Sequence, residues 1–376
     1  MDRLIVHVGY TGGFQNPGNA TTDAQVYADE LRLADLSVDL GFDSLWTVEH
    51  HFTDYFLSPD PVQYLTWMGA RHPHVRLGTS VIVLPWHEPV RCAEQIVMLD
   101  NLSGGRLILG LGRGLGRIEY DGFRMPMERS RERFIAYTEM ILEGIETGFL
   151  EADNEFLVQP RVEIRPRPDY SMRGRVYAAA MSPDAMPIIA RLGIGLLIVP
   201  QKPWPIVAQE LAAYRDAWHD HHGASREPPA PLISGNVVID TDPARVEELA
   251  HRYIGGYYET VIAHYGFAEG AHEGLRGYEF YAGISKYIDK RGTDGAVADY
   301  VNLMPWGTPD QAIEKLRILH SALGVAAFNP SFSFAGMPPD VAEKSVRLFA
   351  TEVLPEIKRW DAPPIPSGPE CGGRVQ

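Results

Sequence analysis

Residues 44–52 read Ser44-Leu45-Trp46-Thr47-Val48-Glu49-His50-His51-Phe52, a short apolar run followed by one carboxylate and two imidazoles. Short runs of β-branched and aliphatic residues are typical of buried strands. In (β/α)8 barrels, the reactive groups lie at the carboxyl ends of the strands, where the βα loops begin. The stretch therefore predicts a parallel strand with acid/base candidates at its end.

Similar runs recur along the chain, with amphipathic helical stretches between them. We predict strands at residues 4–9, 44–48, 75–84, 106–110, 176–180, 195–199, 232–239 and 325–332. Strands that alternate with helices indicate an α/β fold in which parallel strands are covered by helices. Eight such strands favour a closed (β/α)8 TIM barrel over an open doubly wound sheet, although residues 301–304 could form a ninth strand.

The 376 residues could hold two domains, but single barrels reach this size, so we expect one barrel domain over residues 1–360. Residues 149–170 and 266–300 do not fit the plain repeat and are predicted to be insertions, the second of them Gly-rich. Long loops in compact domains are usually functional or mobile. Residues 361–376 are rich in Pro and Gly and are predicted to form a disordered tail.

Several helix starts are predicted from a capping oxygen followed by proline, a ring that needs no N–H partner. The five capping candidates are Ser58, Asp60, Ser182, Asp242 and Thr308. Thr308 also forms a capping box with a glutamine three residues later.

Composition excludes several classes of function. The chain has 34 Lys and Arg against 49 Asp and Glu, a net charge of −15, which would repel nucleic acid and anionic membranes. Its two cysteines, Cys92 and Cys371, lie far apart and have no metal-ligand spacing. No apolar run approaches the roughly 20 residues that span a bilayer. We expect a cytoplasmic protein with no nucleic-acid partner, no membrane partner and no metal.

Three positions at predicted strand ends could carry chemistry. The imidazole of His50 suits a general acid or base, although one of the two adjacent histidines could simply pack. Arg113 lies in the turn Gly110-Leu111-Gly112-Arg113-Gly114-Leu115-Gly116, which could bind phosphate or could be a tight corner with a solvated guanidinium. The turn fails the Rossmann fingerprint. Ser182 could contact the same anion or only cap its helix.

Taken together, these motifs resemble the bacterial luciferase-like flavin-dependent monooxygenases, particularly the luciferase α subunits. The resemblance covers nearly the whole chain, and its motifs occur in the same order. They are residues 41–53 (Gly-Phe-Asp-Ser-Leu-Trp-Thr-Val-Glu-His-His-Phe-Thr), 76–79 (Arg-Leu-Gly-Thr), 99–106 (Leu-Asp-Asn-Leu-Ser-Gly-Gly-Arg), 113–115 (Arg-Gly-Leu), 152–155 (Ala-Asp-Asn-Glu), 277–279 (Gly-Tyr-Glu) and 307–309 (Gly-Thr-Pro).

The resemblance implies a (β/α)8 barrel that takes reduced FMN from a separate flavin reductase. With O2 it would oxygenate a small organic substrate through a C4a-peroxyflavin, by hydroxylation or a Baeyer–Villiger reaction. It also implies a homo-oligomer, dimer or tetramer, with helices near the second and third strands as the candidate interface.

The resemblance also assigns residues. It implies that His50 is catalytic, and we expect Glu49 to orient it. For the flavin it implies phosphate contacts from the Arg113-Gly114-Leu115 turn and Ser182, an acidic neighbour at Glu119, and a non-prolyl cis peptide at Ser80 and Val81 against the flavin ring. We also expect Trp86, Phe14 and Phe56 to form pocket walls.

Two departures from luciferase, Met181 for an acidic residue and Ala185 for a threonine, imply a different phosphate site. The 266–300 loop, which matches the family's mobile active-site loop, also differs in sequence, and with it the substrate. Three alternatives stay open: an F420-dependent hydride-transferring oxidoreductase, a non-catalytic flavin-binding barrel, and a metal-dependent barrel hydrolase. The hydrolase needs a His-x-His at the first strand, where only His7 occurs.

Overall fold

The computed structural model describes residues 6–180, 182–363 and 365. The predicted start of the first strand at residue 4, Met181, Cys371 and most of the predicted tail at 361–376 lie outside these residues.

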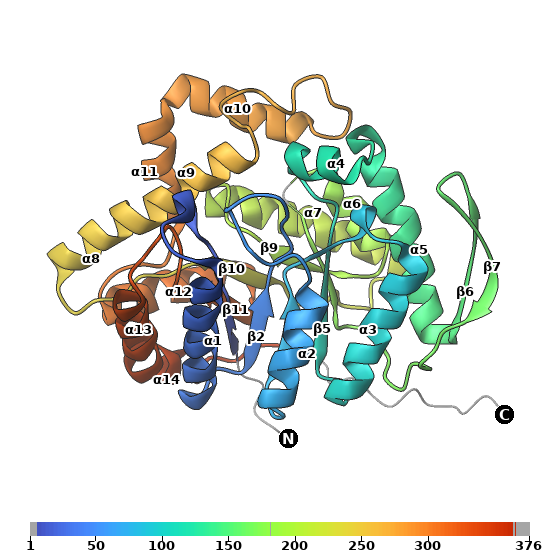
Figure 1. The fold of residues 1–376 in the computed structure, drawn as a ribbon, viewed down its shortest axis with the longest axis horizontal. Helices are drawn as coiled ribbons and strands as arrows, with labels where there is room; N and C mark the ends of the chain where they lie inside the picture. Colours follow the sequence, from blue (N-terminus) through green and yellow to red (C-terminus); the bar gives the residue numbers. More distant parts are fainter. Residues whose placement is uncertain (1–5, 181, 364, 366–376) are drawn as a thin grey trace.

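In the described part of the chain, parallel strands close into an eight-stranded barrel, as predicted (Figure 1). The barrel strands are β1 His7–Thr11, β2 Ser44–Thr47, β3 Arg76–Thr79 continued by β4 Ile82–Val83, β5 Leu107–Gly112, β8 Val176–Ala179, β9 Gly195–Ile198, β10 Leu232–Asn236 and β11 Ala327–Ser331. The sheet runs β3-β2-β1-β11-β10-β9-β8-β5, and the pairing of β3 with β5 closes it. All eight predicted strands are therefore confirmed, with one interrupted by a break between β3 and β4.

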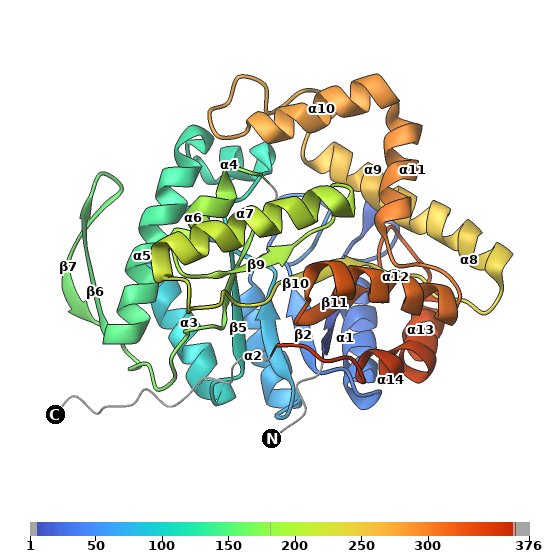
Figure 2. The ribbon, with the colours of Figure 1, turned by 180° about the vertical axis from the view of Figure 1, so that it is seen from behind.

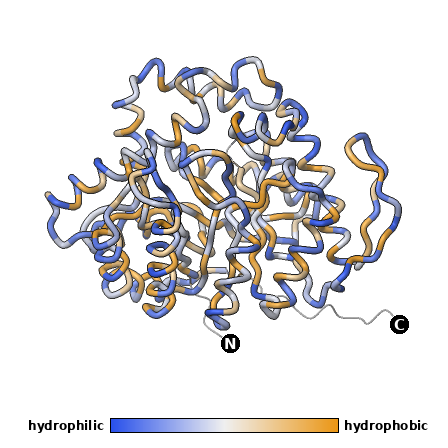
Figure 3. Tube along the Cα trace, in the orientation of Figure 1, coloured by the Kyte–Doolittle hydropathy of each residue, from blue (hydrophilic) through white to orange (hydrophobic). Residues whose placement is uncertain are grey.

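Helices cover the outside of the barrel, and the two views of Figures 1 and 2 show them on all sides. They are α1 Asp23–Asp39, α2 Pro61–Arg71, α3 Pro89–Ser103, α4 Arg117–Phe123, α5 Ser130–Thr147, α6 Ala185–Arg191, α7 Trp204–His222, α8 Pro243–Leu249, α9 Gly255–His264, α10 Glu279–Arg291, α11 Thr293–Leu303, α12 Pro309–Leu323, α13 Pro339–Leu348 and α14 Leu354–Ile357. Figure 3 shows hydrophobic residues gathered toward the centre of the molecule. Because both faces of the sheet are covered, most strand residues are buried, and β2, β5 and β9 are buried along their whole length.

The two predicted insertions have regular structure. Residues 149–170 contain an antiparallel hairpin, β6 Phe149–Asn154 and β7 Leu157–Glu163, which stands out from the barrel in Figure 1. The 266–300 segment was predicted to be a loop, but most of it forms α10 and the first part of α11. The possible ninth strand at 301–304 is wrong, because α11 extends to Leu303. Glycine-rich composition hid these helices, whose apolar residues pack onto the barrel mouth.

Three of the predicted helix caps are confirmed. The side chains of Asp60 and Asp242 accept from backbone N–H groups in the first turns of α2 and α8, and Thr308 forms its capping box. Ser58 is not a cap, because its hydroxyl donates to the Val48 carbonyl at 2.8 Å and ties the loop after β2 to the strand end. Ser182 does not cap α6, which begins three residues later without a side-chain cap.

Candidate active site

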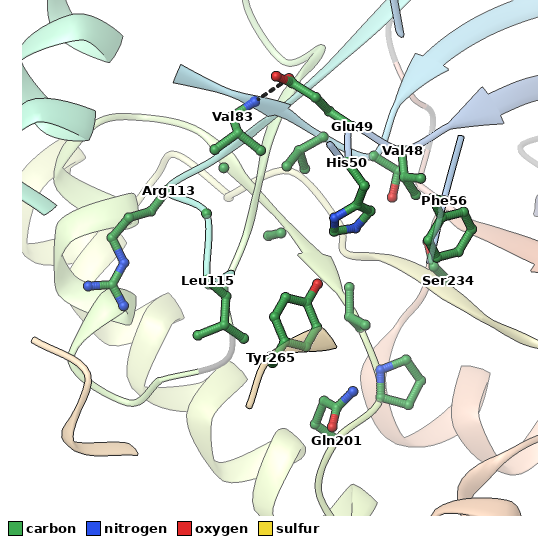
Figure 4. Close-up of a pocket in the computed structure, with 18 of the residues that line it drawn as sticks. Val48, Glu49, His50, Phe56, Val83, Arg113, Leu115, Gln201, Ser234 and Tyr265 are labelled. Atoms are coloured by element: carbon green, nitrogen blue, oxygen red, sulfur yellow. Dashed lines mark hydrogen bonds between the residues drawn. The ribbon is translucent and has the colours of Figure 1, made fainter. Parts of the chain in front are cut away.

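A cavity of about 230 Å³ opens at the carboxyl ends of the barrel strands. All the residues predicted to be catalytic or to bind the flavin line it: Glu49, His50, Ser80, Val81, Arg113, Gly114, Leu115, Glu119 and Ser182. Figure 4 shows His50 and Arg113 on opposite sides of this one cavity. The barrel thus joins residues that are up to 133 positions apart, from Glu49 to Ser182, because the strand ends converge.

The partner of His50 is Glu119, from α4. Oε1 of the carboxylate lies 2.9 Å from His50 Nδ1 and also accepts the backbone N–H of His51 at 3.0 Å. The carboxylate is fully buried, and the His50 side chain is 13% exposed. Since Nδ1 is occupied, Nε2 is the ring nitrogen left to face the cavity.

Glu49 does not orient His50, which corrects our expectation. Its carboxylate lies 3.1 Å from His51 Nε2 and 2.8 Å from His87 Nε2, and it accepts the backbone N–H of Val83 at 2.8 Å (Figure 4). Adjacent residues on an extended segment point in opposite directions, so Glu49 and His51 share one side and His50 takes the other. Glu49 therefore joins the loop after β2 to β4 and the segment before α3.

Both buried carboxylates are held as anions. Burial alone would raise the pKa of Glu119, but the charge of His50 and a contact from His264 lower it to about 2. Burial likewise opposes ionisation of Glu49, yet hydrogen bonds from His51 and His87 bring its pKa below the usual value. Burial alone would lower the pKa of His87, but its hydrogen bond to Glu49 and the charges of Glu49 and Asp60 together raise it.

The far end of the cavity is cationic. Arg113 Nη1 donates to the Gly277 carbonyl at 2.8 Å, and its guanidinium lies 4.0 Å from the centre of the Tyr278 ring. Arg131, from α5, donates to the same carbonyl at 3.1 Å and also lines the cavity. Two guanidinium groups thus meet at one end, a combination suited to a phosphate, and Ser182 also lines the cavity.

The middle of the cavity combines apolar walls with buried polar atoms. The cis peptide expected at Ser80–Val81 is present. Three lining residues have buried side-chain atoms without a hydrogen-bond partner among the described residues: Gln201 Oε1, Ser234 Oγ, and both amide atoms of Asn329. Buried polar groups are normally paired, so these atoms indicate where a ligand's polar edge would bind.

Aromatic side chains form the rest of the wall. Trp86 and Phe56 line the cavity as expected, but Phe14 packs against Tyr27 and Tyr64 instead. A larger set comes from the loop after β2 and from α9, α10 and α11 above the mouth: Tyr55, Tyr257, Tyr265, Tyr281 and Tyr300. The 266–300 segment therefore contributes to the site as predicted, through side chains on helices.

Sequence reasoning missed two residues. Arg131 sits inside an ordinary amphipathic helix and carries no local signal. His264 is the last residue of α9, where a histidine is usually explained by the helix dipole. His50, Glu119 and His264 also form the one group in the described residues whose ligand-type atoms, all within 4.8 Å of one another, could hold a metal ion. No sequence spacing indicated it, because the three residues come from three separate elements.

Comparisons with known proteins identify the family. A family model described as luciferase-like monooxygenase matches residues 6–326. The alkanal monooxygenase alpha chain of Photorhabdus luminescens is 26% identical over 340 residues, which cover 87% of this chain and 91% of the relative. No helix in the described part of the chain is long and apolar enough to cross a membrane.

Solved structures share the fold over nearly their whole length. Monooxygenase RslO1 from Streptomyces bottropensis has a TM-score of 0.72 and 26% identity, covering 93% of this chain and 99% of that one. The FMN complex of the oxygenating constituent of 3,6-diketocamphane monooxygenase from Pseudomonas putida has a TM-score of 0.70 and 15% identity, with 93% and 98% covered. A coenzyme F420-dependent tetrahydromethanopterin reductase from Methanopyrus kandleri has a TM-score of 0.63 and 18% identity, with 95% and 100% covered.

Proposed function

Because the chain belongs to the luciferase-like monooxygenase family, we propose that it is a flavin-dependent monooxygenase that uses reduced FMN and O2 to oxygenate a small organic molecule. One observation carries the proposal. A single cavity places the cationic pair Arg113 and Arg131 at one end and the His50 imidazole on the opposite side. A non-catalytic flavin carrier would need no imidazole held by a buried carboxylate.

The residues present fit FMN. Its phosphate matches the cationic end formed by Arg113 and Arg131, and Ser182 on the cavity wall would be a further donor. Its flat ring matches the apolar middle, lined by Val81 and Leu115. The polar edge of the ring matches the buried side-chain atoms of Gln201, Ser234 and Asn329 that have no hydrogen-bond partner among the described residues. Met181 lies outside the described residues, and Ala185 lines the cavity without adding a phosphate ligand.

Reduced FMN would supply the two electrons with which O2 yields one oxygen atom for the substrate and one for water. The protein's part is proton transfer and positioning. When the His50 imidazole is neutral, a proton on Nδ1 faces the Glu119 carboxylate and leaves the lone pair of Nε2 for the cavity. His50 can therefore take a proton from a reacting group and return it. The imidazolium so formed stays beside the Glu119 anion, which stabilises it.

The aromatic cover has a second role. Tyr257, Tyr265 and Tyr300 lie on or just after the helices above the mouth and line the cavity. Excluding water from the site strengthens its electrostatic interactions and limits wasteful loss of reduced oxygen. We infer that substrates enter beneath this cover.

The proposal is tested by anaerobic titration of the purified protein with reduced FMN, followed by addition of ¹⁸O2 and a panel of small ketones, aldehydes and phenols. We expect saturable binding of reduced FMN and incorporation of one ¹⁸O atom into a product. Arg113→Ala should raise the Kd for FMN about tenfold, since one charged hydrogen-bond donor is lost. Binding of FMN that is indifferent to Arg113 would contradict the assigned phosphate site.

The F420-dependent alternative is favoured by the shared fold of the Methanopyrus kandleri reductase. F420 would transfer a hydride, and O2 would not be consumed. The same titration with reduced F420 separates the two: saturable binding of F420 with O2-independent substrate reduction would replace the monooxygenase proposal.

We also propose a flavin reductase as the source of reduced FMN and a homo-oligomer, dimer or tetramer. The helices after the second and third strands, α2 and α3, expose the apolar side chains Trp67, Met98 and Leu102. Contiguous exposed apolar surface is typical of protein interfaces. Light scattering measures the molar mass of the wild type and of Trp67→Glu, and we expect the variant to have the smaller mass. A monomeric wild type would contradict the oligomer.

A further inference from the structure

His264 lies directly behind the His50–Glu119 pair. Its side chain is 2% exposed, and its ring centre lies 5.1 Å from that of His50 and 4.4 Å from that of Tyr55. Nε2 lies 3.5 Å from Glu119 Oε2, the carboxylate oxygen that His50 does not use. His264 does not line the cavity, so it would touch neither cofactor nor substrate.

The neighbours of His264 decide where its ring proton sits. Nδ1 lies 3.1 Å from Thr53 Oγ1, and that hydroxyl oxygen already accepts the backbone N–H of Tyr55 at 3.4 Å. The hydroxyl proton of Thr53 is therefore free to be donated to Nδ1. A neutral imidazole that accepts at Nδ1 carries its own proton on Nε2. That proton points at Glu119 Oε2.

The charge state of His264 agrees with this arrangement. Burial lowers its pKa, an effect that its contact with Glu119 does not overcome, and the nearby charge of His50 acts in the same direction. Around neutral pH the ring is neutral and has a single proton to donate. Glu119 Oε2 and His264 Nε2 are both buried and have no hydrogen-bond partner among the described residues, and the 3.5 Å between them is slightly long for a hydrogen bond.

We propose that His264 is a positioning residue for His50 that acts through Glu119, its Nε2–H securing one carboxylate oxygen so that the other stays on His50 Nδ1. The inference rests on the proposed function only in that His50 moves a proton. Without the donor from His264, Glu119 would lose an anchor for Oε2 and its carboxylate could rotate away from His50. The buried anion would also lose one of the interactions that keep it ionised.

The cluster around Glu49 supplies a matched control. There too a buried carboxylate contacts two imidazoles, but neither His51 nor His87 lines the cavity. Replacing His264 or His87 by phenylalanine removes one imidazole contact to a buried carboxylate in each case and keeps an aromatic ring. His264→Gln keeps an N–H donor at the first position.

The first readout is ¹³C NMR of the Glu119 carboxyl carbon in protein labelled at glutamate, assigned by its loss in Glu119→Gln. Because it needs neither flavin nor substrate, it tests the inference even if the proposed function fails. We expect His264→Phe to raise the pH at which Glu119 titrates by about one unit, the equivalent of one lost hydrogen bond to a charged group. His264→Gln should return most of this shift, and His87→Phe should leave the Glu119 signal unchanged.

The second readout is steady-state kinetics with a substrate from the ¹⁸O2 screen. His264→Phe should lower kcat about tenfold with KM unchanged, since the residue touches His50's partner and not the substrate. His264→Gln should recover to within about threefold of wild type. Equal losses of kcat in His264→Phe and His87→Phe, or an unshifted Glu119 titration in His264→Phe, would overturn the proposal.

Discussion

Two buried carboxylates, Glu49 after β2 and Glu119 in α4, each contact two imidazoles, and only Glu119 pairs with His50. Glu49 has both oxygens occupied by its contacts with His51, His87 and the Val83 N–H. Glu119 has one oxygen shared by His50 and the His51 backbone, while the other faces His264 at 3.5 Å. Both carboxylate oxygens of Glu49 therefore accept hydrogen bonds, whereas Oε2 of Glu119 accepts none among the described residues.

The difference teaches what each cluster does. A carboxylate with both oxygens hydrogen-bonded joins segments of backbone, and it contributes to the free energy of unfolding. The Glu119 carboxylate, whose Oε2 has only a 3.5 Å contact with His264, can shift slightly as the neighbouring His50 imidazole gains and loses a proton. Changes in the Glu119 cluster should therefore reduce turnover, and changes in the Glu49 cluster should reduce stability.

The largest expected effect distinguishes the two adjacent histidines. His50→Ala should lower product formation by at least about 100-fold, the range of a lost general acid or base, while FMN still binds. His51→Ala, at a residue outside the cavity, should keep turnover per folded molecule near that of wild type. Rapid-quench product analysis and FMN titration measure both. Wild-type turnover in His50→Ala would remove His50 from the mechanism.

The next effect is on stability. Glu49→Gln should lower the free energy of unfolding by about 2–3 kcal/mol, because a neutral amide receives donors that are arranged for an anion. Urea unfolding at neutral pH measures the loss, with Glu248→Gln, at an exposed glutamate, as control. If Glu49→Gln keeps its stability and loses turnover instead, the division between the clusters is wrong.

The two clusters should also differ in the sign of their pH dependence. The raised pKa of His87 gives a stabilisation that is present below about pH 6.5 and is lost as the pH rises through the folded-state value. The lowered pKa of His264 does the reverse, since its burial costs stability as the pH falls below about 6.5.

Urea unfolding of His87→Phe and His264→Phe between pH 5 and 9 measures this contrast. The destabilisation caused by His87→Phe should be greater at low pH, and that caused by His264→Phe greater at high pH, each by about 1 kcal/mol. Parallel profiles for the two variants would show that the imidazoles are not held in different charge states.

The smallest expected effect tests the proton position on His264. Thr53→Val removes the hydroxyl that donates to Nδ1 and keeps the volume of the side chain. It should lower kcat about two- to threefold, since His264 could then place its proton on either nitrogen. Steady-state kinetics measure the change, and ¹⁵N shifts of His264 report the tautomer. A wild-type tautomer in Thr53→Val would show that Thr53 does not set it.

Much of the fold could be predicted because the strands of a parallel barrel are buried on both faces, so they appear in the sequence as short, mainly apolar runs. The same reasoning predicted that His50 and Arg113 lie at the same end of the barrel, because the end of a strand can be located in the sequence. It failed for the 266–300 segment, where many glycines interrupt the apolar periodicity that marks helices. The packing of α10 and α11 over the mouth of the barrel depends on contacts with other elements.

The sequence by itself determined the barrel, its cavity end and the residues at the strand ends, because local periodicity and chain order are enough to specify them. Only the tertiary structure decided which carboxylate serves which imidazole. Glu49 is next to His50 in sequence and turns away from it, while Glu119 and His264 reach it from α4 and α9. Hydrogen bonds between elements depend on direction and distance in three dimensions, and neither is recorded in the spacing of residues along the chain.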